Sequence, residues 1–545
     1  MGKLKRYILS FFLLFISSTL LGQGKPNIVF FLVDDMSPFP MGKSEKNETR
    51  TFGFCGENHV LTPVIDSLAS NGMIFTNAYV SSSVCSPSRY TTLTGRYAGK
   101  CEGDEFMRLH PIGKTTRVEN NTELEKDKFN VAKTLQKNGY RTGFVGKSHI
   151  MEHRKLKDKD LEKNGFKTYA KGDDIKTPTV SEAMQFNHDK WVEIVKEYGF
   201  DYANAIYQGN LRELYNTDAN VHNLEWTTSA AMKFIDESKK REQPFFLYFS
   251  TTVPHGPQPW LKKEGKYIHG LDADPNITSA GYKEIDYSFM PSRKEIKKEV
   301  EANKNLRENQ AWIRWFDRSV EAIVKQLKEK GIYENTLIVI TSDHGTYHYG
   351  KTTLYENGVK VPLMMHYPKG IKKGSKFKGM VQNIDYAPTL LELAGIKINA
   401  DIELDGSSLL PTFTDQNVKI HDYLFFELGF ARGVLADNWK YISVRYTPEI
   451  QDKIAKGEKF KGFKGELINV PYYTRNGHLG HYSSLHNPLY FEPDQLFNLT
   501  SDPTEKENIY SSNTKKAKEL KEILKMKLKE FPNRSYGEFV TLENQ

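Results

Sequence analysis

The chain has 545 residues, enough for one large domain with a smaller one or for two or three ordinary domains. Hydrophobic residues make up 38% and charged residues 26% of it, which is ordinary for a soluble globular protein and argues against long disorder. The formal net charge is +8, a modest excess that suits an anionic ligand, and we expect no nucleic-acid partner.

The N-terminus has the layout of a secretory signal peptide. Lys3, Lys5 and Arg6 precede an apolar stretch at 7–21, and small and polar residues follow. The apolar run is too short for a comfortable membrane span, and an uncleaved anchor is the alternative. We therefore expect residues 1–23 to be removed and the mature chain to be exported, to the periplasm or as a secreted protein, without stable membrane insertion.

Buried strands alternate with helices over much of the chain that follows. In chain order, we expect a strand at 27–33, a helix at 62–72, a helix at 130–137, a strand at 141–145, a helix at 227–239, a strand at 244–250, a helix at 305–330, strands at 336–341 and 361–366, and a helix at 386–394. This alternation predicts an α/β fold with a mostly parallel central sheet between helices.

Two polar stretches, 43–58 and 155–189, have weak periodicity and are expected to be surface insertions. Beyond about Pro411 the pattern changes to shorter strands, with one expected at 433–444 and a Lys-rich helix at 515–531. We therefore divide the chain into a signal peptide (1–23), a catalytic domain (24–410) and a smaller C-terminal α+β subdomain (411–545).

Three cysteines are present: Cys55, Cys85 and Cys101. Cys85 stands out because it follows Ser81-Ser82-Ser83-Val84, a stretch suited to a tight loop that opens a helix at about Pro87. Arg89 lies one helical turn after Cys85, so both side chains would share a face. A nucleophile at a helix N-terminus faces free backbone amides that favour an anion, whereas a buried structural cysteine is the plainer alternative.

Carboxylates end two of the expected strands. Asp34 and Asp35 follow the strand at 27–33, and Asp343-His344 follows the strand at 336–341. The carboxyl ends of such strands form the ligand-binding edge of an α/β sheet. Adjacent carboxylates repel one another unless a cation lies between them, and oxygen ligands suit Ca²⁺ or Mg²⁺, although histidine is less usual for a hard cation.

The pentapeptide Cys85-Ser86-Pro87-Ser88-Arg89 matches the C-x-P-S-R signature of the type I sulfatases of the alkaline phosphatase superfamily. Other family motifs follow in the same order: Gly146-Lys147-Ser148-His149, Pro254-His255-Gly256-Pro257 and the stretch from Gly350-Lys351 to Tyr355-Glu356. The resemblance extends from about Lys25 into the C-terminal region and is closest to bacterial polysaccharide sulfatases. It implies an alkaline-phosphatase-like fold and a sulfuric ester hydrolase.

The resemblance also implies the parts of the site. A formylglycine-generating or anaerobic maturation enzyme would oxidise Cys85 to Cα-formylglycine, the nucleophile, beside one Ca²⁺ held by Asp34, Asp35, Asp343, His344 and the modified Cys85. Arg89 would hold the nucleophile and a sulfate oxygen, and Lys147 would neutralise sulfate charge. Lys351 would bind the sulfate and the leaving oxygen. His255 would protonate the leaving alcohol, and His149 would take a proton as sulfate is released.

Two alternatives stay open: a phosphodiesterase or phosphonate monoester hydrolase of the same superfamily, and a non-catalytic carbohydrate-binding relative. The resemblance suggests a sulfated polysaccharide or oligosaccharide as substrate, with ulvan or carrageenan ahead of host glycosaminoglycans. Aromatic and basic residues are candidates for a sugar subsite: Arg154, Trp191, Arg212, Tyr347, His348, Arg432 and His481. Cys55 and Cys101 are either a disulfide or two free thiols.

Overall fold

The computed structural model describes residues 24–39, 51–56, 60–152, 161–257, 262–263, 266–267, 270–303, 310–346, 350–399, 402–531 and 533–541. The expected signal peptide, parts of both expected insertions, and Arg154, Tyr347 and His348 lie outside these ranges. Among the described helices, none combines the length and the apolar character needed to cross a membrane.

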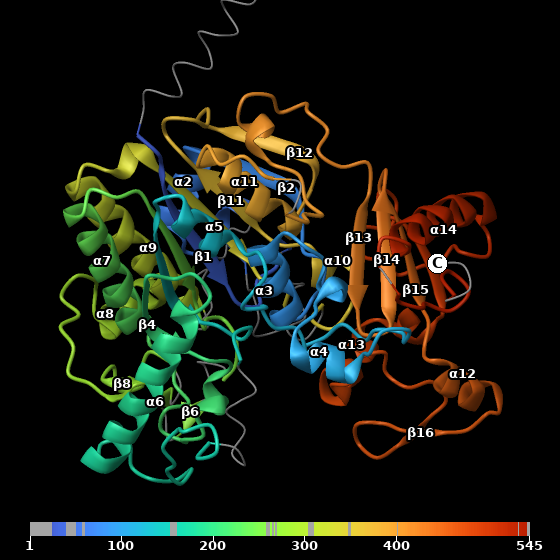
Figure 1. Ribbon diagram of the computed structural model, residues 1–545, viewed down its shortest axis with the longest axis horizontal. Coiled ribbons are helices and arrows are strands. Elements are labelled where there is room, and N and C mark those ends of the chain that lie inside the picture. The colour runs from blue at the N-terminus through green and yellow to red at the C-terminus, as the bar shows by residue number, and fades with distance from the viewer. Residues whose placement is uncertain are drawn as a thin grey trace, which may run out of the picture.

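An eight-stranded sheet forms the centre of the larger domain (Figure 1). Its order is β12-β2-β11-β10-β1-β5-β3-β4, and only β11 runs antiparallel to its neighbours. The strands are β1 (Asn27–Val33), β2 (Met73–Tyr79), β3 (Arg141–Lys147), β4 (Tyr202–Tyr207), β5 (Phe245–Ser250), β10 (Thr336–Ser342), β11 (Leu363–His366) and β12 (Ser375–Gln382). The predicted mostly parallel sheet is therefore confirmed.

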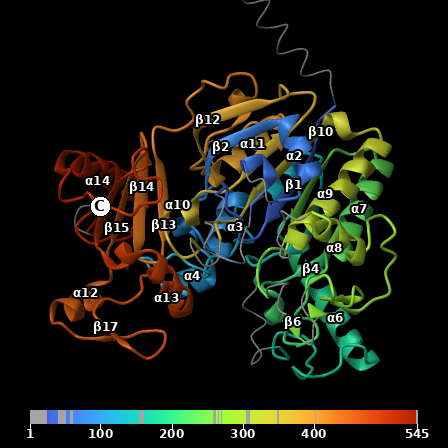
Figure 2. The same cartoon turned by 180° about the vertical axis from the view of Figure 1, so that it is seen from behind.

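Both faces of this sheet are covered by helices, as β1 shows. Alternate side chains of a strand point to opposite faces, so Ile28, Phe30 and Leu32 join one core and Val29 and Phe31 join the other. The first core includes α3 (Cys85–Thr94), α5 (Val131–Lys137) and α11 (Tyr386–Leu393). The second includes α2 (Pro63–Ser70), α7 (Leu224–Lys240), α8 (Arg293–Glu301) and α9 (Ala311–Glu329), seen from behind in Figure 2.

The five predicted strands agree with β1, β3, β5, β10 and β11 to within two residues. The polar stretch at 155–189, by contrast, is not all loop, because its last part begins α6 (Pro178–Lys196). Helix α6 starts with proline, and its buried residues, which include Val180, Met184 and Trp191, recur every three or four positions. Besides 3-10 turns, the other described α-helices and strands of this domain are short: α4 (Asp104–Leu109), α10 (Glu356–Val359) and the hairpins β6–β7 (Lys262–Lys263, Lys266–Tyr267) and β8–β9 (Ile277–Thr278, Gly281–Tyr282).

A second sheet dominates the C-terminal region. It has the order β13 (Leu424–Leu428), β14 (Ala431–Ala436), β15 (Trp439–Val444) and β18 (Asp494–Asn498). The single strand predicted at 433–444 is wrong, because Asp437 and Asn438 adopt positive φ angles of 47° and 64° and reverse the chain between β14 and β15. Residues of these types tolerate that left-handed conformation in tight hairpins.

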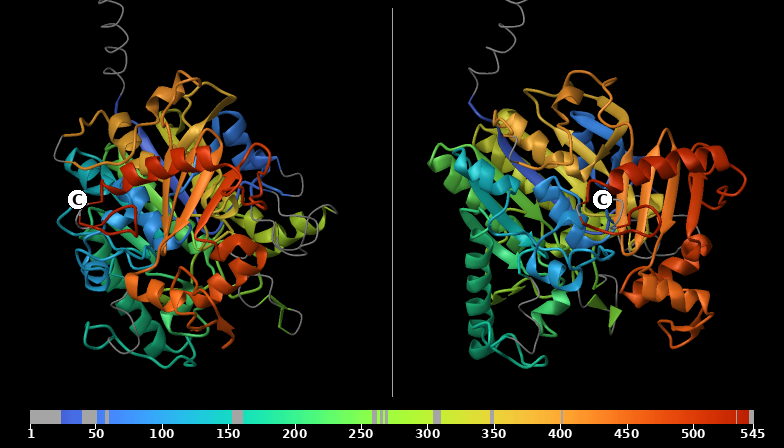
Figure 3. Two further views of the ribbon diagram at one scale, coloured as in Figure 1. Left: turned by 90° about the vertical axis from the view of Figure 1, so that its right-hand side faces the viewer. Right: turned by 45° about the vertical axis from the view of Figure 1, so that its right-hand side comes forward.

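Helix α14 (Thr514–Leu528) covers the outer face of this sheet, as the red helix across the orange strands in Figure 3 shows. On the inner face, Leu424, Phe426 and Leu428 join the core of the larger domain. Between β15 and β18 the chain forms α12 (Pro448–Ala455), the hairpin β16–β17 (Phe460–Lys461, Leu467–Ile468) and α13 (Gly477–His486). The α+β character of this region is as predicted, and the boundary at 410/411 stays a prediction.

A buried ion-pair cluster fastens the two sheets together. Lys440 of β15 is fully buried, and its Nζ lies 2.6 Å from Glu356 Oε1 and 2.9 Å from Glu505 Oε1. The same ammonium donates to the carbonyl oxygen of Leu354 at 3.2 Å. Glu356 begins α10, directly after the Gly350-Lys351 motif, so this cluster ties that segment to the C-terminal sheet.

Replacing Lys440 with methionine should lower the free energy of unfolding by about 3–5 kcal/mol, because the buried Glu505 would lose its counter-charge and Glu356 would keep only the more distant Lys360 ammonium. Urea denaturation monitored by circular dichroism measures the change. Lys456→Met is the matched control, since Lys456 is exposed and pairs only with exposed Asp452. Equal effects of the two substitutions would contradict a special contribution of the buried cluster.

Candidate active site

The ten predicted site residues converge at one edge of the large sheet. Strands β10, β1, β5 and β3 are neighbours and parallel, so their carboxyl ends meet at the same edge. Their ends deliver Asp343 and His344, Asp34 and Asp35, His255, and Lys147 and His149. Helix α3 adds Cys85 and Arg89, and the segment before α10 adds Lys351.

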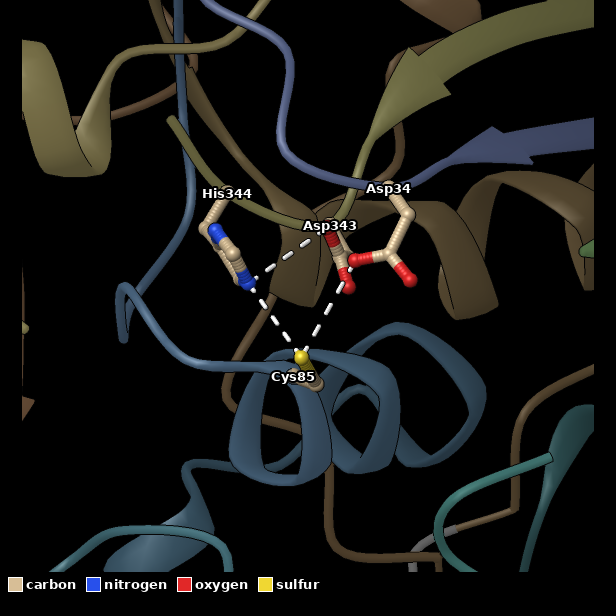
Figure 4. Close-up of side chains that lie close together, drawn as sticks. All are labelled: Asp34, Cys85, Asp343 and His344. Atoms are coloured by element: carbon tan, nitrogen blue, oxygen red, sulfur yellow. Dashed lines mark hydrogen bonds and ion pairs between the residues drawn. The ribbon is translucent and has the colours of Figure 1, made fainter. Parts of the chain in front are cut away.

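Cys85 is the first residue of α3, two residues earlier than the predicted helix start. Its Sγ lies 3.4 Å from His344 Nε2 and 3.9 Å from Asp34 Oδ1, and Figure 4 shows the thiol facing both side chains. The ammonium groups of Lys351 and Lys147 lie 3.5 and 3.7 Å from the sulfur. Burial raises the pKa of the Cys85 thiol, but these two positive charges, together with hydrogen bonds from His149 and His255, outweigh burial and hold the pKa well below its usual range.

Arg89 lies one turn after Cys85 and is completely buried. Its Nη2 and Nε both donate to Asp343 Oδ2, at 2.8 and 3.1 Å, and Nη2 lies 3.4 Å from Asp34 Oδ2. Its Nη1 donates to the Ser250 hydroxyl and to the Lys147 carbonyl oxygen. The guanidinium therefore bridges the carboxylates that end β1 and β10, with the geometry that favours arginine over lysine.

The two lysines add positive charge beside Asp34 and Asp35. Lys147 Nζ donates to Asp34 Oδ2 at 2.5 Å, and Lys351 Nζ donates to Asp35 Oδ1 at 2.8 Å. Burial raises the pKa of the Asp34 carboxyl, but the Lys147 charge and other cations outweigh it, so the net pKa is lowered. Burial, and then the Asp34 charge, raises the pKa of Asp343 to about 6. The three carboxylates of the cluster therefore pair with three cations, Arg89, Lys147 and Lys351.

The donor atoms suit a divalent cation. Ligand atoms of Asp34, Cys85, Asp343 and His344 lie within 4.8 Å of one another, and those of Asp34, Asp35 and His255 form an overlapping group. His344 Nε2 lies 3.4 Å from Asp35 Oδ1 and 3.6 Å from Asp343 Oδ1, so its ring faces the carboxylates. Carboxylate oxygens gathered at one point are what a Ca²⁺ or Mg²⁺ site requires.

His149 follows β3 and His255 follows β5, and the side chains of both histidines hydrogen bond with Cys85. His149 is buried and has a positive φ of 60°, an uncommon backbone conformation that clusters at functional sites. The Nδ1 of His255 donates to the Gly256 carbonyl oxygen at 2.8 Å, which orients the ring. Of the ten residues, His255 alone is only partly buried, so it marks the side of the site that solvent reaches.

Two contacts in the site involve residues that the sequence did not single out. Ser250, the last residue of β5, accepts from Arg89, and Asn210 Oδ1 accepts from Lys147 Nζ at 2.9 Å. Asn210 follows β4, a strand that was not predicted, so no motif or strand end indicated it. Asn120 was also missed, and its Oδ1 accepts the backbone amide of Ser86 at 3.0 Å.

The residues predicted as candidates for a sugar subsite differ in their exposure. Trp191 and Arg432 are buried, and their proposed sugar contacts are wrong: Trp191 stacks on Phe166, and Arg432 donates to Thr116. The structure leaves Arg212 exposed and His481 part-exposed on α13. Cys55 and Cys101 are free thiols, which settles the alternative left open by the sequence.

Comparison with known proteins agrees with this site. The family model "Sulfatase" matches residues 26–396, and the model for the C-terminal region of N-sulphoglucosamine sulphohydrolase matches residues 342–451. An ulvan-active sulfatase of Formosa agariphila is 25% identical over 90% of this chain and 76% of its own length. An N-acetylglucosamine-6-O-sulfatase of Bacteroides thetaiotaomicron is 23% identical over 95% and 89%.

A solved structure of a candidate sulfatase from Bacteroides fragilis has a TM-score of 0.60 at 22% identity, and the match covers 95% of this chain and 98% of that one. At this identity the likeness shows the fold. The family match, which spans more than half of the chain, establishes that the protein belongs to the sulfatase family, the enzymes that hydrolyse sulfate esters.

Proposed function

We propose that this sulfatase removes sulfate from a sulfated polysaccharide or oligosaccharide, with Cys85 converted to formylglycine as its nucleophile. The observation that carries the proposal is the position of Cys85 at the start of α3, within 3.7 Å of two lysine ammonium groups and hydrogen bonded to two histidines. Formylglycine would supply a hydrated aldehyde with two oxygens on one carbon, one for attack on sulfur and one for release of sulfate.

Lys147 and Lys351 would neutralise the sulfate group. Their ammonium groups flank Cys85 and are already held by Asp34 and Asp35, so they need little rearrangement when an anion binds. Positive groups fixed before the reaction stabilise developing negative charge most effectively in a buried site. Arg89 would hold the nucleophile and one sulfate oxygen while it keeps Asp343 in place.

The two histidines would handle different protons. His255 lies at the solvent side, where the alcohol part of a large substrate must extend, so it would protonate the leaving oxygen. His149 is buried, and its backbone carbonyl accepts the Ser86 hydroxyl at 2.8 Å. It would take the proton that must leave when sulfate is released.

The cation in this proposal is one Ca²⁺, with Asp34, Asp35, Asp343 and His344 as protein ligands beside residue 85. When bound, it would offset the carboxylate charge and favour the ionised form of the nucleophile. The oxygen-rich donor set supports calcium over a transition metal, and His344 is the one ligand that departs from this preference.

For the substrate, the relatives supply the argument. One is named as active on ulvan and another as acting on 6-O-sulfated N-acetylglucosamine, so a carbohydrate sulfate is the common element. We place ulvan or carrageenan ahead of glycosaminoglycans. Export through the signal peptide at 1–23, with the periplasm as the destination, would bring the enzyme to such polymers, and a maturation enzyme would act on Cys85 beforehand.

Cys85→Ser should abolish turnover while leaving the fold intact, because serine has only one oxygen on the reacting carbon. Sulfate released from aryl sulfate and from a panel of sulfated oligosaccharides measures activity, and mass spectrometry of the peptide containing residue 85 measures the aldehyde. Cys55→Ser is the control. Wild-type kcat in Cys85→Ser would refute the nucleophile, and faster turnover of an aryl phosphate diester than of an aryl sulfate would favour a phosphodiesterase.

Asp343→Asn should lose the bound cation and lower kcat/KM by more than about 100-fold, because even indirect partners of a metal are worth about 10–100-fold. Elemental analysis should find one calcium per wild-type chain. Asp437→Asn is the matched control, since this exposed turn residue has the backbone conformation that asparagine tolerates. Active protein that contains no divalent metal would contradict the assignment.

His255→Ala and His149→Ala should each slow turnover by roughly 10²–10⁴-fold, but with different substrate dependence. A nitrophenol leaving group needs no protonation, so the defect of His255→Ala should shrink with nitrophenyl sulfate relative to an alkyl or sugar sulfate. The defect of His149→Ala should be the same for both substrates. The reverse pattern would exchange the two roles.

A further inference from the structure

We propose that Ser483, on α13 of the C-terminal region, is a positioning residue that holds Lys351 in the active site. The inference rests on the proposed role of Lys351 in binding sulfate. Ser483 lies beyond both stretches matched by the family models, 26–396 and 342–451. Its side chain is completely buried and contacts the segment that carries the catalytic lysine.

The segment after Gly350 is held from one side by the loop that precedes Cys85. The Ser83 hydroxyl donates to the Thr353 carbonyl oxygen at 2.5 Å and accepts the Thr353 amide at 3.1 Å. The Thr352 amide donates to the Ser83 carbonyl oxygen at 3.2 Å. These bonds fix residues 352 and 353, and they leave the carbonyl group of Lys351 to be satisfied from elsewhere.

Ser483 satisfies that carbonyl from the opposite side. Its hydroxyl donates to the Lys351 carbonyl oxygen at 2.8 Å and lies 3.1 Å from Thr352 Oγ1. Because a serine hydroxyl has a single hydrogen, Thr352 must be the donor in the second bond. One side chain of α13 therefore contacts both the backbone of Lys351 and the side chain of its neighbour.

These contacts matter because the backbone here is strained. Thr352 has a φ of 67°, and a β-branched residue rarely adopts this left-handed conformation. Such strain persists only where surrounding contacts hold it. Without the Ser483 hydroxyl, Thr352 would lose one of the contacts that hold this conformation, and the carbonyl group of Lys351 would lose its bond to α13. The backbone at residue 351 could then shift, and the Lys351 side chain would move with it.

A movement of Lys351 would directly change its contacts with Asp35 and Cys85. Lys351 Nζ lies 2.8 Å from Asp35 Oδ1 and 3.5 Å from Cys85 Sγ, so a small displacement alters both contacts. Misplacement of a group by about 1 Å can cost roughly 10²-fold in rate. We therefore expect Ser483 to influence catalysis although it contacts neither the substrate nor the nucleophile.

The test uses the full-length, matured enzyme with Ser483→Ala, Ser483→Thr and Ser484→Ala, each also combined with Lys351→Ala. Ser484 is the matched control, because it neighbours Ser483 on α13 but donates within the helix, to the His481 carbonyl oxygen at 2.8 Å. Measurements are kcat, KM, the inhibition constant of inorganic sulfate and Tm. If Ser483→Ala does not fold, Ser483→Cys, which keeps the size and weakens the hydrogen bond, takes its place.

We expect Ser483→Ala to lower kcat/KM by about 10–100-fold and to weaken sulfate inhibition, with Ser483→Thr restoring most of both and Ser484→Ala changing neither. In the Lys351→Ala background, Ser483→Ala should have no further effect. Two results would overturn the positioning role alone. One is an equal loss of kcat/KM from Ser483→Ala in both backgrounds. The other is wild-type kinetics of Ser483→Ala together with a large loss in Lys351→Ala. Full activity of Lys351→Ala would overturn the proposed role of the lysine and this inference with it.

Discussion

The buried carboxylates of Asp34, Asp35 and Asp343 impose the constraint on which the rest of the site depends. An unpaired buried charge costs several kcal/mol, and like charges in one cluster add repulsion. The compensating positive charges come from Arg89, Lys147 and Lys351, each bonded to at least one of these carboxylates. Lys147 and Lys351 also lie within 3.7 Å of Cys85 Sγ, so the cations that balance the carboxylates also place positive charge beside residue 85.

Three cations match three carboxylates in number, but burial still disfavours the ionised form of Asp343. With Arg89 bonded to it, Asp343 has a pKa raised to about 6, first by burial and then by the Asp34 charge. The divalent cation that we propose would favour the ionised carboxylates at the point where they meet His344 and residue 85. In this proposal one set of charges binds both the metal and the sulfate, so losing either kind of cation should disturb both.

Sequence patterns predicted those site residues that lie where a strand ends. Asp34 and Asp343 could be placed because an apolar strand precedes each, and parallel neighbouring strands bring such ends together. Asn210 and Ser483 could not be predicted, because single polar residues away from a predicted strand end carry no spacing that separates them from other asparagines and serines. Their roles depend on pairings between distant segments.

The errors have two origins. Trp191 and Arg432 were chosen for their residue type, and residue type does not say which face of an element is buried. Helix α6 places Trp191 on its inward side, and β14 places Arg432 beside Thr116. The reversal at Asp437 and Asn438 was hidden because strong strand-forming residues flank it on both sides. The burial of Trp191 and Arg432 depends on tertiary packing, whereas the reversal is a local turn whose Asp-Asn signal was overlooked.

The two regions of the chain, each with its own sheet, both help to hold the segment that carries Lys351. Tyr355 donates to Gln495 at 2.7 Å, and Lys440 joins Glu356 to Glu505, so the segment that carries Lys351 is fastened to the C-terminal sheet at its far end. Ser483 fastens it at the near end. The segment that carries the lysine proposed to bind sulfate is thus held by both regions, by Ser83 in the larger one and by Ser483 in the smaller one. Under this proposal, a change on α13 alters the chemistry while every motif of the family remains in place.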